Sequence, residues 1–155
     1  MQVVDIISPE RVFYGMHAIS KKRTLEQAAG LIAQQLPGLQ ANELFEGLVG
    51  RERLGSTGIG HGVAIPHARL KQSGTTIGAL IKLSQPVDFD AIDRQPVDLV
   101  FVLLVPQDAN ETHLKMLSQL AEMFSSSDIR EALRDAHDSN EMYQRLVQFQ
   151  PASSS

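Results

Sequence analysis

The stretch VDLVFVLLV, residues 97–105, is apolar at every position except Asp98. A short run of branched apolar residues predicts a β-strand, and its lack of alternation with polar residues predicts that both faces are buried. Residues 77–83 alternate instead, with Ile77 and Leu83 at the two ends of the pattern, and they predict a second strand. Residues 97–105 are therefore interpreted as a central strand of a sheet.

Amphipathic helices are predicted before these strands. Thr24–Gln27 has the sequence of a capping box, the apolar positions that follow it have helical spacing, and Pro37-Gly38 ends the segment. A second helix is predicted from near Asn42. It places Arg51 close to its C-terminal end, just ahead of a glycine-rich loop.

Further helices are predicted after residue 105. Thr112 is an expected N-cap, which places His113 in the first turn of a helix. Two short capped helices are expected to begin near Asp128 and Asp138. Strands mixed with helices, without the regular alternation of a doubly wound fold, predict the α/β fold class, built as a single three-layer domain.

The composition of the 155-residue chain is that of one globular domain, with 43% hydrophobic and 21% charged residues. A net charge of −4, with 14 Lys and Arg, argues against a nucleic acid as partner. No apolar run approaches the length of a membrane span and the first residues lack the pattern of a signal peptide, so we expect no membrane insertion and a cytoplasmic location. The absence of cysteine excludes thiolate nucleophiles and zinc–thiolate sites.

The stretch GSTGIGHGVAIPHARL, residues 55–70, contains two histidines and four glycines. Val63–Ile65 is expected to form a short buried strand that Pro66 ends, since proline cannot donate the next hydrogen bond of a ladder. His67 is then expected at the end of that strand. Binding crevices form at strand ends in open α/β sheets, which favours a functional role for His67.

Three familiar site motifs do not fit this stretch. It lacks the Gly-Lys-Ser/Thr of a P-loop, its glycines are spaced G-x-G-x-G rather than G-x-G-x-x-G, and Ser56 is not framed as G-x-S-x-G. A nucleotide site and a serine-hydrolase site are therefore disfavoured. Two interpretations of Ser56 and Thr57 stay open: their hydroxyls stabilise a turn, or they contact a phosphate group.

Two chemical interpretations of the histidines remain open from the residues alone. His61, His67 and His113 could bind zinc together with Glu111, but their spacing matches no two-histidine metal motif, which disfavours a metal site. His67 could instead act as a nucleophile toward phosphorus through the lone pair of a neutral imidazole, with Arg51 and His113 supporting the phosphoryl oxygens. Core or loop packing is the alternative for each of these side chains.

The stretch GRERLGSTGIGHGVAIPHARL, residues 50–70, resembles the active-site region of the mannitol/fructose-type enzyme IIA domains of the bacterial phosphotransferase system. The segments SKKRTLEQAA, FDAIDRQPVDLVFVLLVP and THLKMLSQLAEMF extend the resemblance, and together they are most similar to the nitrogen-regulatory branch. The resemblance implies one domain of this type over residues 1–150, with a mixed parallel and antiparallel sheet flanked by helices on both faces. Residues 151–155 fall outside it, and we expect them to form a disordered tail.

The resemblance also implies the roles of three residues. The histidine that follows the Ile-Pro pair accepts phosphoryl in this family, and that position is His67. The family's supporting arginine lies sixteen positions earlier, at Arg51 (67 − 51 = 16), and its second histidine, in the segment THL, is His113. His61 matches no functional residue of the family. The transfer implied needs no metal and no cofactor.

The function implied is that of a regulatory enzyme IIA of the nitrogen phosphotransferase system. Such a protein receives phosphoryl from a small histidine phosphocarrier protein on His67 and signals its phosphorylation state to target proteins, such as potassium-transport components or sensor kinases. A fructose- or mannitol-type enzyme IIA of a sugar permease is the alternative within the family. A small His-ligated metalloenzyme is the alternative outside it.

Overall fold

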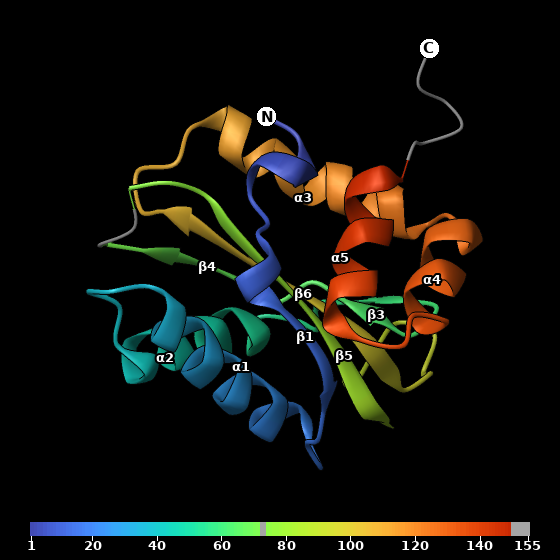
Figure 1. The fold of residues 1–155 in the computed structure, drawn as a ribbon. Helices are drawn as coiled ribbons and strands as arrows, with labels where there is room; N and C mark the ends of the chain where they lie inside the picture. The colour runs from blue at the N-terminus through green and yellow to red at the C-terminus, as the bar shows by residue number, and fades with distance from the viewer. Residues whose placement is uncertain (72–73, 150–155) are drawn as a thin grey trace.

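The computed structural model describes residues 1–71 and 74–149. Over these residues a mixed sheet lies between two layers of helices (Figure 1). The predicted fold class, an α/β domain of three layers, is therefore confirmed. The tail expected at residues 151–155 lies outside the described residues.

The sheet has six strands in the described part of the chain. In chain order they are β1 (Val12–Met16), β2 (Gly58–Gly60), β3 (Val63–Ala64), β4 (His67–Leu70), β5 (Ile77–Val87) and β6 (Val97–Pro106). Their spatial order is β1-β5-β6-β3-β2, and β4 also pairs with β6. The β5–β6 and β2–β3 pairs are antiparallel, whereas β1–β5, β3–β6 and β4–β6 are parallel, so the sheet is mixed as expected.

Helices cover both faces of the sheet. Within the described residues they are α1 (Lys21–Gln35), α2 (Ala41–Glu52), α3 (Glu111–Phe124), α4 (Ser127–Arg134) and α5 (Ser139–Gln148), and the 3₁₀ turns η1 (Val3–Asp5) and η2 (Pro9–Arg11) precede β1. Figure 1 shows α1 and α2 on one face and α3, α4 and α5 on the other. The short helices predicted near Asp128 and Asp138 are α4 and α5.

Strand β6 lies between two separate apolar cores. Val100 and Val102 pack with buried residues of α1 and α2, whereas Leu99, Phe101 and Leu103 pack with buried residues of α3, α4 and α5. Successive side chains of a strand point to opposite faces, so the buried positions on both faces of β6 need apolar residues, and only the partly buried Asp98, paired with Lys82 and Arg134, is polar. This explains why residues 97–105 show no alternation of apolar and polar residues.

Strands β3 and β4 pair one after the other with the same side of β6. Val63 pairs with Leu99 and His67 pairs with Leu103, so the offset stays the same across Ile65-Pro66 (99 − 63 = 103 − 67 = 36). The prediction that Pro66 leaves His67 at the end of a strand was wrong, because His67 is the first residue of β4. Proline lacks an N–H but keeps its carbonyl, which accepts a hydrogen bond from the Leu103 N–H at 2.9 Å and continues the ladder.

Two predicted helix starts were also wrong. Ser20, not Thr24, caps α1 by accepting a backbone N–H of the first turn at 3.1 Å, and the buried Thr24 hydroxyl donates to the Ser20 carbonyl at 2.8 Å. Asn110, not Thr112, caps α3 by accepting the Thr112 N–H at 3.0 Å. Neighbouring polar residues can all serve as N-caps, so sequence alone did not separate them. His113 lies in the first turn of α3, as predicted.

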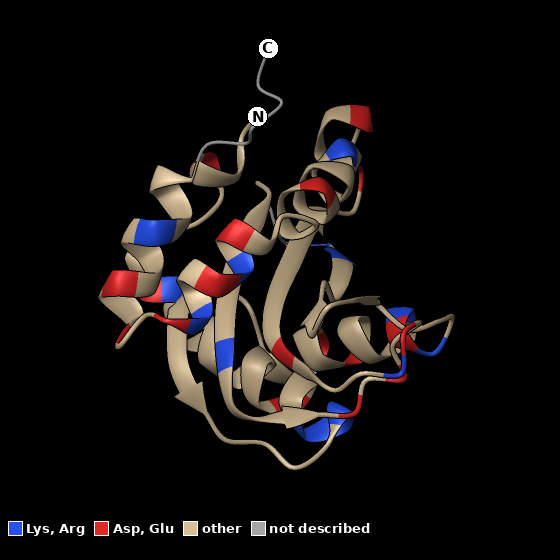
Figure 2. Ribbon diagram, turned by 90° about the vertical axis from the view of Figure 1, so that its right-hand side faces the viewer, with Lys and Arg blue, Asp and Glu red and all other residues tan. Residues whose placement is uncertain are grey.

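Charged side chains lie mainly outside the sheet. Figure 2 shows acidic and basic residues interspersed over the helices and loops, while the strands carry few of them. Across the described ranges, no helix combines the length and the apolar character needed to cross a bilayer.

Candidate active site

His67 has both ring nitrogens in hydrogen bonds. Its Nδ1 lies 2.9 Å from the Ile65 carbonyl oxygen, and the Arg51 Nε donates to its Nε2 at 3.1 Å. A carbonyl can only accept and a guanidinium can only donate, so the ring is held as the neutral tautomer with hydrogen on Nδ1. The lone pair of the ring therefore lies on Nε2, on the side of Arg51.

The pKa of His67 lies below the ordinary histidine value of 6.5, first because partial burial penalises the charged ring. The hydrogen bond to the Ile65 carbonyl acts in the opposite direction, the positive charge of Arg51 lowers the pKa further, and the Glu52 carboxylate raises it. The net shift is downward, so His67 is neutral at pH 7. A neutral imidazole is the form that can act as a nucleophile.

Arg51 comes from the last turn of α2 and is held by two hydrogen bonds. Besides its bond to His67, its Nη1 donates to the Gly55 carbonyl at 2.9 Å. Its other N–H groups have no hydrogen-bond partner among residues 1–71 and 74–149. A guanidinium oriented in this way can bind the oxygens of an anionic group placed beside His67.

His113 is the third residue of α3, and its ring is held by Thr76. The Thr76 hydroxyl makes a hydrogen bond with His113 Nδ1, and Thr76 itself is only 6% exposed, just before β5. Sequence reasoning missed Thr76. The contact joins residues 37 positions apart, so no local pattern marks it.

The three predicted site residues line one surface hollow of about 370 Å³. Its walls are otherwise largely apolar, and Leu54 on its rim is 84% exposed. The structure therefore brings Arg51, His67 and His113 together from α2, β4 and α3. The apolar residues that line the hollow with them are Leu54, Ala68, Leu103, Val105, Leu114 and Leu117.

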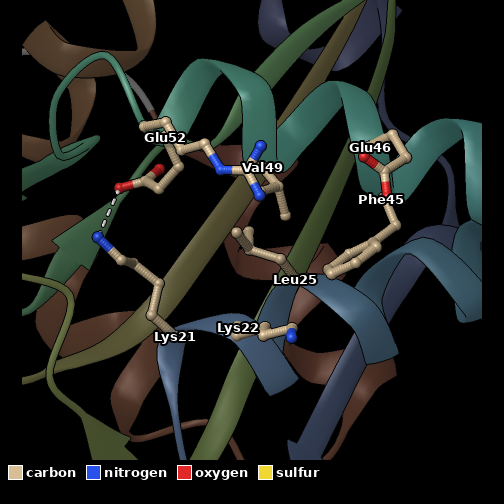
Figure 3. Close-up of a pocket in the computed structure, with 8 residues that line it drawn as sticks. Lys21, Lys22, Leu25, Phe45, Glu46, Val49 and Glu52 are labelled. Atoms are coloured by element: carbon tan, nitrogen blue, oxygen red, sulfur yellow. Dashed lines mark hydrogen bonds and ion pairs between the residues drawn. The ribbon is translucent and has the colours of Figure 1, made fainter.

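Glu52 anchors the loop that follows Arg51, and sequence reasoning missed it too. Its buried carboxylate accepts the Thr57 N–H at 3.0 Å and the Thr57 hydroxyl at 2.6 Å, and it pairs with Lys21 at 3.3 Å. Figure 3 shows the Lys21–Glu52 pair beside a second hollow, of about 390 Å³, lined by residues of α1 and α2. The hydrogen bonds between Glu52 and Thr57 close the short loop that contains Gly55. Since the Gly55 carbonyl accepts a hydrogen bond from Arg51, Glu52 supports the orientation of the guanidinium.

His61 is exposed and is not one of the residues that line the hollow of His67. It lies in the turn between β2 and β3, outside the contacts described above. In the part of the chain that the structure describes, no three His, Cys, Asp or Glu side chains are grouped so that they could hold a metal ion. The geometry therefore gives no support to the zinc interpretation of His61, His67, His113 and Glu111.

The family model of the phosphoenolpyruvate-dependent sugar phosphotransferase system, EIIA 2, matches residues 5–148. This chain belongs to that enzyme IIA family and is a component of a phosphotransferase system. Domains of this family receive phosphoryl groups from phosphocarrier proteins and pass them on.

Within the family, the chain is similar to nitrogen regulatory proteins, as the sequence motifs indicated. The nitrogen regulatory protein of Pseudomonas aeruginosa is 48% identical over 150 residues, which cover 97% of each chain. The crystal structure of nitrogen regulatory protein IIA-Ntr from Neisseria meningitidis is 42% identical, with a TM-score of 0.85 over 92% of this chain and 97% of that one. The crystal structure of IIA mannitol from Escherichia coli shares the fold at 18% identity, with a TM-score of 0.74 over 90% of this chain and 98% of that one.

Proposed function

We propose that this protein is a regulatory enzyme IIA of the nitrogen phosphotransferase system and that it accepts phosphoryl on Nε2 of His67. One observation carries the proposal: a histidine held neutral, with its lone pair on Nε2, faces an arginine in an open hollow. The donor is a small histidine phosphocarrier protein. The similarity to nitrogen regulatory proteins supports the regulatory branch.

The transfer exchanges one phosphorus–nitrogen bond for another. The Nε2 lone pair of His67 attacks phosphorus, the bond to the donor's ring nitrogen breaks, and the donor leaves as a neutral imidazole with that electron pair. The His67 ring becomes positively charged because it keeps its Nδ1 proton. The Ile65 carbonyl, which accepts that N–H at 2.9 Å, stabilises this charge.

Arg51 and His113 stabilise the phosphoryl oxygens during the transfer. In the free protein the Arg51 Nε–H is bonded to the lone pair that must react. When the donor docks, this N–H and the unpaired N–H groups of the guanidinium move to the phosphoryl oxygens, which frees Nε2. These N–H groups, together with His113, then meet the charge spread over the equatorial oxygens, which favours the transition state.

The surface around His67 suits brief contact with a second protein. The donor is itself a side chain of a folded protein, so the acceptor must be reachable by a face-to-face approach. Exposed Leu54 and the partly exposed Leu114 and Leu117 surround the polar residues of the hollow. Apolar residues at the centre of a modest contact area are typical of such transient interfaces.

We propose that phosphorylated and unphosphorylated forms are read by target proteins, with potassium-transport components and sensor kinases as the candidates. A doubly charged phosphoryl group in the hollow changes the charge of the surface that such a target meets. A sugar-specific enzyme IIA would use the same site, but it would pass the phosphoryl group to a sugar-permease domain.

The test is incubation with phosphoenolpyruvate, enzyme I and the small phosphocarrier, followed by mass measurement of the intact protein. The expected result is a gain of one acid-labile, base-stable phosphoryl group, which requires all three additions. A protein that stays unmodified contradicts the proposal. Rapid passage of the label to a sugar-permease domain would assign the sugar-specific function instead.

A further inference from the structure

The hydroxyl of Thr76 determines which nitrogen of the His113 ring carries hydrogen. Thr76 is 6% exposed, and among the described residues its hydroxyl makes one hydrogen bond, with His113 Nδ1. A hydroxyl has one hydrogen to donate and lone pairs that accept, and the hydrogen is the costly group to leave unpaired when buried. The hydroxyl is therefore best satisfied when it donates to Nδ1.

This direction of donation has a consequence for the rest of the ring. If Nδ1 accepts, a neutral His113 must carry its hydrogen on Nε2. Nδ1 is occupied by Thr76, so Nε2 is the nitrogen left for a group that enters the hollow, which the His113 side chain lines. The opposite tautomer would direct a lone pair, rather than an N–H, toward negatively charged phosphoryl oxygens.

We propose that Thr76 is a positioning residue that holds His113 as the Nε2–H tautomer, so that this ring donates a hydrogen bond to the phosphoryl group during transfer. The inference rests on the proposed function. The two histidines of the hollow are then held in opposite tautomers by different partners. The Ile65 carbonyl keeps hydrogen on Nδ1 of His67, which leaves a nucleophilic Nε2, whereas the Thr76 hydroxyl keeps hydrogen on Nε2 of His113.

The first test reads the tautomer directly and does not depend on any partner protein. Nitrogen-15 NMR of the histidine rings above pH 7 is expected to show His113 with hydrogen on Nε2 in the wild type and in Thr76→Ser, which keeps the hydroxyl. Thr76→Val has nearly the same shape but no hydroxyl, and its His113 is expected to populate both tautomers. The His67 ring, with hydrogen on Nδ1 in all three proteins, reports that the fold of the site is unchanged.

The second test measures the rate of phosphoryl transfer from the phosphorylated phosphocarrier. Thr76→Val is expected to slow transfer about tenfold, the effect of one lost neutral hydrogen bond, and Thr76→Ser is expected to restore most of the rate. In a His113→Ala background, Thr76→Val is expected to slow transfer no further, because Thr76 acts on transfer only by holding the His113 ring, which that background lacks.

The outcomes separate this inference from the function on which it rests. A wild-type His113 with hydrogen on Nδ1, or an equal slowing by Thr76→Val with and without His113, would overturn the role of Thr76 while His67 still became phosphorylated. A wild-type protein that accepts no phosphoryl would overturn the proposed function, and the NMR result would then still report whether Thr76 sets the tautomer.

Discussion

Of the two histidines in residues 55–70, His61 is held through its backbone and His67 through its imidazole ring. His61 has a φ of 58° in the turn between β2 and β3, and its backbone is fixed at both ends: its N–H donates to Asp93 at 2.9 Å and its carbonyl accepts from Arg134 at 2.6 Å. At His67 the imidazole itself is fixed, by the Ile65 carbonyl and by Arg51.

The two positions therefore place different demands on the residue. At His61 the contacts require a backbone that adopts a positive φ, and Asn or Asp adopts that conformation readily. At His67 the contacts require an imidazole, because no other side chain offers an N–H and a nitrogen lone pair on opposite sides of a ring. The sequence motif already singles out His67, which follows the Ile-Pro pair, and the contacts add the physical difference: the backbone is held at His61 and the imidazole is held at His67.

Removal of the imidazole at His67 is expected to have the largest effect. His67→Ala is expected to reduce phosphorylation by the phosphocarrier to background, since no other described histidine combines a fixed Nε2 lone pair with a bound arginine. The measurement is labelling with phosphoenolpyruvate, enzyme I and the phosphocarrier. Thermal unfolding serves as the control, with stability expected within about 1 kcal/mol of the wild type because the side chain is only partly buried. Label retained in this variant would remove His67 from its role.

His113→Ala tests whether a second ring in the hollow supports the first. Transfer is expected to slow by about 10²–10³, the usual effect of losing one preorganised donor to a charged transition state, while the label stays on His67. Rapid-quench time courses with peptide mapping measure both quantities. His137→Ala, which removes an exposed histidine paired with Glu141, is the matched control and is expected to transfer at the wild-type rate. Wild-type kinetics in His113→Ala would show that His113 has no role in transfer beyond its place in the first turn of α3.

Arg51→Lys keeps the positive charge beside His67 but removes the planar fork. A lysine cannot hold the Gly55 carbonyl and a phosphoryl group in the same geometry, so transfer is expected to slow by about 10–100-fold, the effect of one lost charge-assisted hydrogen bond. Arg53→Lys changes an exposed arginine two positions further along and is the control. Equal rates in these two variants would mean that the charge of Arg51, and not its geometry, matters.

The pH dependence of transfer sharpens the account of the His67 ring. The neutral ring reacts, and burial lowers its pKa below the ordinary 6.5, so the midpoint of the fall in rate on acidification is expected below pH 6.5. The free energy of unfolding is also expected to fall on acidification. The pKa of this histidine is higher in the unfolded chain, so the unfolded chain binds the proton first and is stabilised relative to the folded protein. Stopped-flow rates between pH 5 and 8 check this, and a midpoint above 6.5 would contradict the downward shift of the His67 pKa.

The smallest effect is expected at His61. His61→Asn retains a residue that tolerates positive φ, so stability is expected within about 0.5 kcal/mol of the wild type and the transfer rate unchanged. Gly62→Ala in the same turn is the contrast, because φ is +77° there and an added Cβ would lie 2.5 Å from Arg134 Nη2. Its expected cost is about 1–3 kcal/mol. Thermal unfolding and transfer kinetics measure both, and slowed transfer in His61→Asn would give His61 a chemical role.

Much of the fold could be predicted because it depends on local patterns. The apolar run of β6, interrupted only by Asp98, predicted a strand buried on both faces, and the helical spacing of apolar residues predicted α1 and α2. The errors occurred where neighbouring residues are chemically interchangeable or where a residue has two roles. Ser20 and Asn110, rather than Thr24 and Thr112, cap their helices. The prediction at Pro66 considered its missing N–H but not its carbonyl, which accepts a hydrogen bond from Leu103.

The site was predictable only in part, for a physical reason. Arg51, His67 and His113 could be singled out because they are reactive residue types in motifs that resemble a known family. Thr76 and Glu52 act by holding other groups, and a hydroxyl or a carboxylate has many possible partners in a folded chain. Their roles depend on contacts across the tertiary structure, which the spacing of residues does not reveal.

The atom that carries the phosphoryl group in the wild-type protein can be determined directly. Nitrogen-15-labelled protein is phosphorylated through the phosphocarrier and examined by phosphorus–nitrogen correlation NMR, with peptide mapping under basic conditions. The account predicts a single phosphoryl group, bonded to Nε2 of His67, with the hydrogen on Nδ1 retained. A phosphoryl group on Nδ1 of His67, on His61 or on His113 would contradict it.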